Sequence, residues 1–247
     1  MEIQIHDESG LSTMEVTHLS KKLGWSLCLL AVGLCVSSLP AMADSTLFSD
    51  LGPPGNVYVG GIGWSINGSG PPFGSSFTAA GMFTVGGSGN FSVDSIDLAV
   101  GQVNAPFTFD ASIWTDNAGL PGVQVANAAF DNLMSNQPFG GCCGLVTVSG
   151  ISGVTLTGGQ SYFMVLGPVS LTDSSAVAWN WNNQGVNGLE LTSPDGGMTW
   201  DSHGVTTIGA FDIIGHQGGT TPEPSSLLLL GTGLVGAFGA IRRKLNR

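Results

Sequence analysis

Positive charge is missing from the middle of the chain. All six Lys and Arg residues lie near the ends, and none lies between Asp44 and Thr221, although that stretch holds twelve Asp and Glu residues. Proteins bind nucleic-acid phosphates by neutralising them with Lys and Arg, so this absence excludes nucleic acid as a partner. It also excludes a Lys that forms a Schiff base and an Arg that clamps a phosphate or carboxylate substrate.

Catalytic and metal-binding motifs are also scarce. The chain has no Gly-x-Ser-x-Gly turn, no His-Glu-x-x-His helix and no EF-hand loop. Asp110 and Asp116, with Asn117, could offer oxygen ligands to Ca²⁺, but such residues more often bend turns through local hydrogen bonds. His203 could act as a base or ligand, yet a solvated loop histidine is the favoured interpretation. We therefore expect no catalytic residue, metal or cofactor.

The N-terminus has the three parts of a secretory signal peptide. Lys21 and Lys22 precede an apolar run over residues 23–36, and Ala41-Met42-Ala43 forms a small-x-small cleavage site. Residues 1–43 are thus predicted to be removed by signal peptidase after Ala43. The first thirteen residues are polar and acidic, which is unusual before such a signal. Met14 is therefore an alternative start of translation.

The C-terminus carries a second apolar run, over residues 227–241, interrupted by four glycines. As a helix, its fifteen residues would reach about 22 Å, against about 30 Å of hydrocarbon core. It is therefore marginal as a permanent membrane span. The basic cluster Arg242, Arg243 and Lys244 would hold its end on the cytoplasmic side. An ordinary tail anchor is the alternative to a temporary membrane helix.

The segment "PEPSSLLLLGTGLVGAFGAIRRK" resembles the PEP-CTERM sorting signal of Gram-negative bacteria. Pro222, Glu223 and Pro224 match its motif, and residues 242–244 match its basic end. Thr221 stands where the family often has Val. The resemblance implies recognition by an exosortase, a membrane-embedded cysteine protease. It also implies export linked to exopolysaccharide, with the protein at the inner membrane during sorting and then at the cell surface or in the matrix.

Between the signals, residues 44–215 alternate short β-prone runs with turns rich in Gly, Pro, Asn and Asp. This pattern predicts an all-β sandwich or jelly roll, followed by a linker over residues 216–221. The predicted strands are Val57–Ile66, Ser76–Val85, Phe91–Val100, Phe107–Thr115, Gly122–Phe130, Leu145–Val148, Val154–Thr157, Ser161–Leu166, Ala176–Asn182 and Thr206–Ile214.

Alternation along the strands predicts which tryptophans are buried. Trp179 and Trp181 lie on an apolar face and are expected in the core. Trp114 shares the polar face of its strand, opposite Phe109 and Ile113. Trp114, and Trp200 beside a predicted turn, are therefore the candidates to stack on sugar rings.

Only two cysteines survive removal of the signal peptide, Cys142 and Cys143 in "FGGCCGLV". In an exported protein they can join each other, join another chain or stay free. A vicinal disulfide needs a strained ring, which the flanking Gly141 and Gly144 would ease. The spacing is not Cys-x-x-Cys, so a redox-active site is not expected.

The body resembles choice-of-anchor domains, in particular type R, through "IWTDNAGLPG", "LTGGQSYFMVLGP" and "AVAWNWN". Such domains are similar to β-sandwich carbohydrate-binding modules and often precede sorting tails. The expected function is a non-enzymatic surface or matrix protein that associates with exopolysaccharide in a biofilm. A carbohydrate-binding module proper is the alternative, and a secreted hydrolase is the least favoured.

Overall fold

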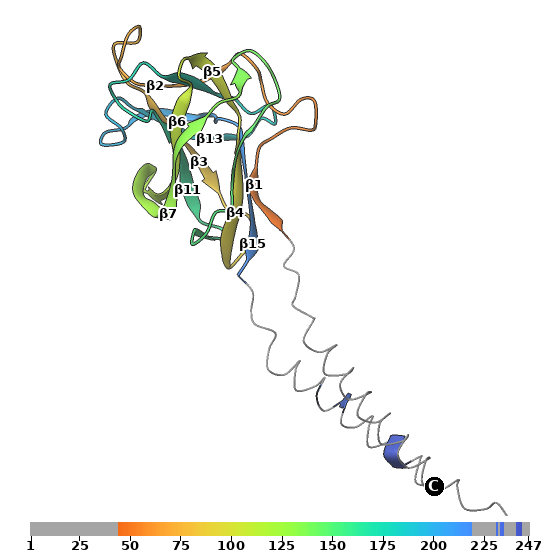
Figure 1. The fold of residues 1–247 in the computed structure, drawn as a ribbon. Coiled ribbons are helices and arrows are strands. Elements are labelled where there is room, and N and C mark those ends of the chain that lie inside the picture. Colours follow the sequence, from red (N-terminus) through yellow and green to blue (C-terminus); the bar gives the residue numbers. More distant parts are fainter. Residues whose placement is uncertain (1–43, 219–230, 232, 235–240, 244–247) are drawn as a thin grey trace, which may run out of the picture. The chain divides into compact units, whose positions relative to one another are not determined.

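The computed structural model describes residues 44–218, 231, 233–234 and 241–243 (Figure 1). Ala41, Ala43, the Pro222–Pro224 triplet and Lys244 lie outside these residues, as do the predicted signal peptide and most of the predicted membrane helix. Residues 231, 233–234 and 241–243 are helical and exposed. No helix in the described part of the chain is long and apolar enough to cross a membrane.

The described residues from Ser45 to Gln217 form fifteen strands in three sheets. The first sheet has the order β1 (Ser45–Ser49), β15 (Phe211–Gln217), β4 (Asn90–Leu98), with β9 (Val146–Ser149) and β10 (Thr155–Thr157) both pairing with β4. The second has the order β14 (Asp201–Thr207), β13 (Asn187–Ser193), β3 (Thr78–Thr84), β11 (Ser161–Gly167), β6 (Thr108–Asn117), β7 (Leu120–Met134). The third has the order β2 (Gly63–Asn67), β12 (Ala176–Asn180), β5 (Val100–Asn104), β8 (Gln137–Pro138).

The main core lies between the first two sheets, and the third sheet adds to it. Figure 1 shows β1, β15 and β4 on one side of the domain and β3, β11 and β7 on the other. Along β6, Phe109, Ala111 and Ile113 point into this core, where they join Trp179 and Phe211. The predicted all-β sandwich is confirmed, and alternation along β6 places its polar face outside.

A smaller apolar cluster covers the other face of the six-stranded sheet, which we call the outer face. It is built from Ala80 on β3, Phe163 and Val165 on β11, and Leu191 on β13. Trp114 and Trp200 pack against it as partly buried side chains. The outer face is therefore a second packed layer and not a fully solvated surface.

Several strand predictions were wrong at their ends. The run predicted as Thr206–Ile214 is divided between β14 and β15, and β15 continues through His216 and Gln217, which were assigned to the linker. His203 lies on β14 and not in a loop. The division falls at Gly209, whose missing side chain lets Trp179 approach: a Cβ there would lie 2.1 Å from the indole.

The two tryptophans expected in the core differ. Trp179 is fully buried, and its Nε1–H donates to the carbonyl of Ala210 at 3.1 Å. Trp181 is only partly buried and packs against Trp64, with ring centroids 5.9 Å apart. The alternation of residues along the predicted strand placed Trp181 in the core. However, β12 ends at Asn180, so Trp181 lies beyond the strand and is not fully buried.

Candidate functional site

A cavity of about 190 Å³ lies on the outer face, and we call it the Trp114 cavity. Backbone at Gly167 and Gly196 forms part of its wall. Its polar and aromatic lining consists of Thr78, Asp110, Ser112, Trp114, Gln124 and Asp131. These residues come from β3, β6 and β7, and the rest of the lining comes from β11, the segment after it and the loop after β13, so the fold brings distant segments of the chain together to build the site.

Strand register explains why these side chains converge. Asp110, Ser112 and Trp114 occupy alternate positions of β6 and therefore share its outer face. Across the ladder, Asp110 lies opposite Gly167 and Ser112 opposite Val165. Because Gly167 has no side chain, the sheet is open beside Asp110. The Nε1–H of Trp114 donates to Ser112 Oγ at 2.8 Å, which fixes the orientation of the indole.

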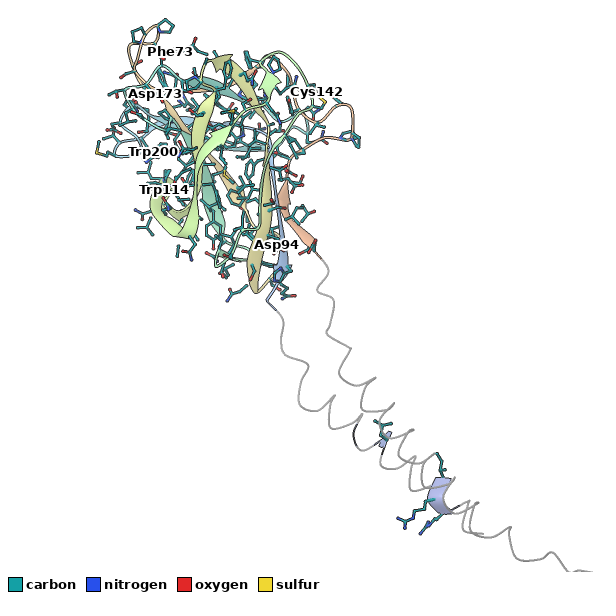
Figure 2. All side chains as sticks on the ribbon, in the orientation of Figure 1. Phe73, Asp94, Trp114, Cys142, Asp173 and Trp200 are labelled. Atoms are coloured by element: carbon teal, nitrogen blue, oxygen red, sulfur yellow. A yellow bond between two sulfur atoms is a disulfide. The ribbon has the colours of Figure 1, made fainter. Side chains whose placement is uncertain are left out.

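The two candidate sugar-stacking tryptophans meet beside one glycine. A Cβ placed on Gly197 would lie 3.3 Å from Trp200 and 3.6 Å from Trp114. Figure 2 labels both indoles on the same side of the domain. Both indoles pack against the apolar cluster of the outer face, but of the two only Trp114 also lines the cavity. Trp200 thus supports the neighbouring loop, and Trp114 is the aromatic side chain next to the open space.

The loop between β13 and β14 is fixed by one carboxylate. Asp195 accepts hydrogen bonds from the backbone N–H groups of Met198 and Thr199 at 3.1 and 2.8 Å, and from the hydroxyl of Thr199 at 2.7 Å. The bonds from Thr199, followed by one from the Ser193 hydroxyl at 2.8 Å, lower the pKa of Asp195 to about 2, and the Met198 N–H adds a smaller decrease. The loop carries Gly196 and Gly197, so Asp195 holds one wall of the cavity in place.

Negative charge gathers at the cavity. Burial raises the pKa of Asp110, and Asp131 and Asp173 nearby raise it further, whereas the backbone N–H of Asn132 lowers it by donating to Oδ1 at 2.7 Å. No Lys or Arg occurs between residues 44 and 220 to balance these charges. The alternation of residues along β6 predicted that Trp114 and Asp110 share one face. It could not predict Thr78, Gln124 and Asp131, because only the folding of other strands brings these residues to the cavity.

The calcium candidates do not converge. Asp110 and Asp116 lie six residues apart along β6, which is about 20 Å in a strand. Asp116 Oδ1 instead accepts the backbone N–H of Gly119 at 2.7 Å, the local turn bond that was the favoured interpretation. The described residues contain no group of three His, Cys, Asp or Glu side chains placed to hold a metal ion.

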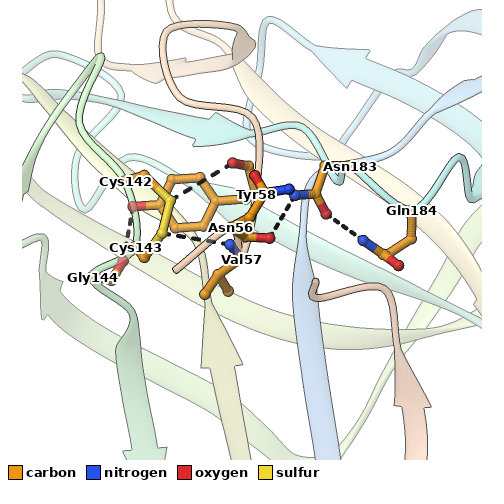
Figure 3. Close-up of a disulfide and its surroundings, with 8 residues drawn as sticks. All are labelled: Asn56, Val57, Tyr58, Cys142, Cys143, Gly144, Asn183 and Gln184. Carbon is orange, nitrogen blue, oxygen red and sulfur yellow. Dashed lines mark hydrogen bonds between the residues drawn. A yellow bond between two sulfur atoms is a disulfide. The ribbon is translucent and has the colours of Figure 1, made fainter. Parts of the chain in front are cut away.

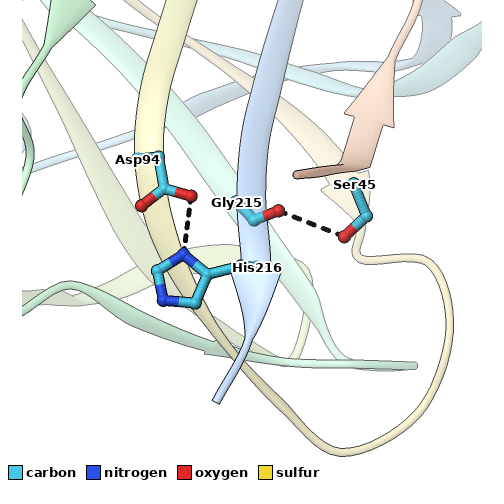
Figure 4. A network of polar contacts seen from close by, with 4 residues as sticks. All are labelled: Ser45, Asp94, Gly215 and His216. Carbon is cyan, nitrogen blue, oxygen red and sulfur yellow. Dashed lines mark hydrogen bonds and ion pairs between the residues drawn. The ribbon is translucent and has the colours of Figure 1, made fainter. Parts of the chain in front are cut away.

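The two histidines of the body make separate contacts. His203 Nε2 lies 2.9 Å from Thr192 Oγ1, and its ring packs against Trp64. His216 Nδ1 lies 2.7 Å from Asp94 Oδ2 at the end of β15, where Ser45 Oγ donates to Gly215 (Figure 4). In the described part of the chain no hydroxyl or thiol hydrogen-bonds to His216 Nε2, so the pair lacks the nucleophile of a triad.

The structure joins Cys142 and Cys143 by a disulfide (Figure 3). The backbone N–H of Val57 donates to Cys143 Sγ at 3.5 Å, and the Tyr58 hydroxyl donates to the carbonyl of Gly144 at 3.1 Å. Cys142 Sγ lies 3.9 Å from the Tyr58 carbonyl, a contact without a proton because the sulfur is oxidised. The disulfide segment is thus docked onto the loop before β2. The oxidation state in cells stays a prediction.

One segment of the chain matches a known family model. Residues 220–244 match the PEP-CTERM protein-sorting motif. This range contains the Pro222–Pro224 triplet and the basic residues 242–244. The motif implies an exported protein that is processed by an exosortase and passes through the membrane to the cell surface. No curated protein and no solved structure matches the chain. The resemblance of the body to choice-of-anchor domains gains no support from these comparisons.

Proposed function

We propose that this chain is a non-enzymatic protein of the cell surface or extracellular matrix that associates with exopolysaccharide. The sorting motif at residues 220–244 carries the proposal, since it supplies the route to the surface. The body is a β-sandwich without Lys or Arg, which repels anionic partners and favours solubility outside the cell.

A carbohydrate-binding module in its own right is the second candidate. One observation favours it: an oriented indole, Trp114, lies beside carboxylates and a hydroxyl in a single cavity. Protein sites for sugars combine an aromatic face, which covers the C–H surface of the ring, with polar groups that bind its hydroxyls. The two candidates are compatible if this cavity is the point of attachment to the matrix.

Matrix retention tests the proposal. We expect the exported protein to co-purify with exopolysaccharide from a producing strain and to appear in the medium of a strain that makes none. Trp114→Ala should shift the protein to the medium, whereas Trp181→Ala, which removes a partly buried indole away from the cavity, should not. Equal retention in the two strains would refute the association with exopolysaccharide.

The same material tests the absence of catalysis. Incubating the purified protein with the isolated exopolysaccharide should release no new reducing ends. Release that is lost in Asp110→Asn would instead assign a hydrolase whose acid or base lies in the Trp114 cavity.

A further inference from the structure

Thr78 presents a buried hydroxyl to the Trp114 cavity. The residue is 3% exposed, and its Oγ1 has no hydrogen-bond partner among the described residues. Buried polar groups nearly always have a partner. A Cβ on Gly167, another residue of the cavity wall, would lie 3.2 Å from this oxygen, so the missing side chain of Gly167 leaves space beside the Thr78 hydroxyl. A ligand hydroxyl or ammonium could supply the missing partner.

The negative charge around the cavity favours a ligand that carries a positive charge. Asp110 and Asp131 line it, and Asp173 lies near enough to raise the pKa of Asp110. Asp110 Oδ1 is occupied by the N–H of Asn132, whereas no described residue donates to the side chain of Asp131. A uronic acid or a sulfated sugar would be repelled here. An ammonium group would form charge-assisted hydrogen bonds with the carboxylates.

Shape and aromatic character limit the ligand to one ring. The cavity, at about 190 Å³, is smaller than the roughly 300–1,000 Å³ of sites for drug-sized ligands. The Trp114 indole lines the cavity, and the π face of an indole favours both the C–H surface of a sugar and a nearby cation. A single sugar ring with an attached ammonium could hydrogen-bond to the Thr78 hydroxyl, pair with the carboxylates and stack on the Trp114 indole at the same time.

We infer that the Trp114 cavity binds the ammonium-bearing ring of an amino sugar with a free amine, such as a glucosamine residue of a polysaccharide. The inference rests on the proposed association with exopolysaccharide and names the chemical class that the protein recognises. Thr78 binds a ring hydroxyl, Asp131 binds the ammonium group, and Trp114 covers one face of the ring.

Binding of two matched oligosaccharides tests the inference. The full chain in detergent micelles is titrated with glucosamine tetrasaccharide and with N-acetylglucosamine tetrasaccharide, by calorimetry and tryptophan fluorescence. We expect the free-amine oligomer to bind at least tenfold tighter. Asp131→Asn should remove that preference, and Thr78→Val should weaken binding of the amine oligomer about tenfold. Asp116→Asn removes the same charge from the exposed far end of β6 and should change neither affinity.

Three outcomes would overturn the inference. Equal binding of both oligomers would assign a neutral-sugar site and leave the association with exopolysaccharide intact. An equal loss in Asp116→Asn and Asp131→Asn would assign the preference to the net charge of the protein. Binding of neither oligomer would exclude this ligand class, and the matrix-retention experiment would still decide the proposed function independently.

Discussion

Replacing Asp50 by Asn should make the stability of the domain less dependent on pH. Asp50 is 1% exposed and lies after β1, where its Oδ1 accepts the backbone N–H of Phe211 at 2.7 Å. Its Oδ2 has no partner among the described residues. Burial raises the pKa of this carboxyl from 3.8 to about 8, although the Phe211 N–H lowers it; Asp212 adds a smaller increase. The folded protein therefore holds a proton that the unfolded chain releases.

The sign follows from this difference in bound protons. Because the pKa of Asp50 is raised in the folded state, its contribution to the free energy of unfolding is complete below about pH 4. This contribution is lost progressively as the pH rises to about 8. Each pH unit in that window costs about 1.4 kcal/mol. Between pH 5 and pH 7, Asp50 alone should lower the free energy of unfolding by about 3 kcal/mol. Burial also raises the pKa of Glu190 and raises that of Asp212 to about 6, so they act in the same direction.

Urea unfolding of the full chain in micelles, followed by tryptophan fluorescence at pH 5, 6 and 7, measures the effect. The wild type should lose stability as the pH rises. Asp50→Asn keeps the acceptor for Phe211, removes the charge, and should lose about 3 kcal/mol less over the same range. Asp116→Asn, an exposed control, should follow the wild type. Identical slopes for the wild type and Asp50→Asn would show that Asp50 does not release a proton when the domain unfolds.

Three further predictions concern packing and the disulfide. Gly209→Ala would place a methyl group against the indole of Trp179 and should lower the free energy of unfolding in urea by about 1–3 kcal/mol or more. Gly86→Ala is the control, because its Cβ would make only an ordinary contact at 3.4 Å, and it should cost much less. The Cys142→Ser, Cys143→Ser double variant should cost only about 1 kcal/mol, because a disulfide between adjacent residues closes almost no loop. Mass spectrometry should find no alkylated thiol in the unreduced exported protein, and two labelled thiols without reductant would contradict the vicinal bond.

Alternation predicted the face that carries the site, but not the site itself. Along β6 the regular pattern separated Phe109 and Ile113 from Asp110 and Trp114, as the structure has it. The other polar residues of the cavity could not be predicted, since Thr78 reaches Asp110 only through the order β3, β11, β6. Packing of the whole sheet sets that strand order, so the sequence around Thr78 or Asp110 does not reveal it.

β13 shows why some strands escaped prediction. It lies inside the six-stranded sheet, yet it contains Gly188 and a fully buried Glu190. A charged residue inside a short run argues against a buried strand. Burial raises the pKa of Glu190 well above its usual value, and Gly81 opposite leaves room for the side chain, with Oε2 3.1 Å from where a Cβ would lie. The local pattern was therefore misleading for a physical reason.

The C-terminus of the surface protein decides whether the chain is processed at the sorting motif. Mass spectrometry of the surface fraction should be compared between cells with and without the exosortase. We predict that residues beyond the Pro222–Pro224 region are missing from the surface protein when the protease is present. In cells that lack the protease, the chain should extend to Arg247. A surface protein that still ends at Arg247 in cells with the protease would contradict processing at the sorting motif.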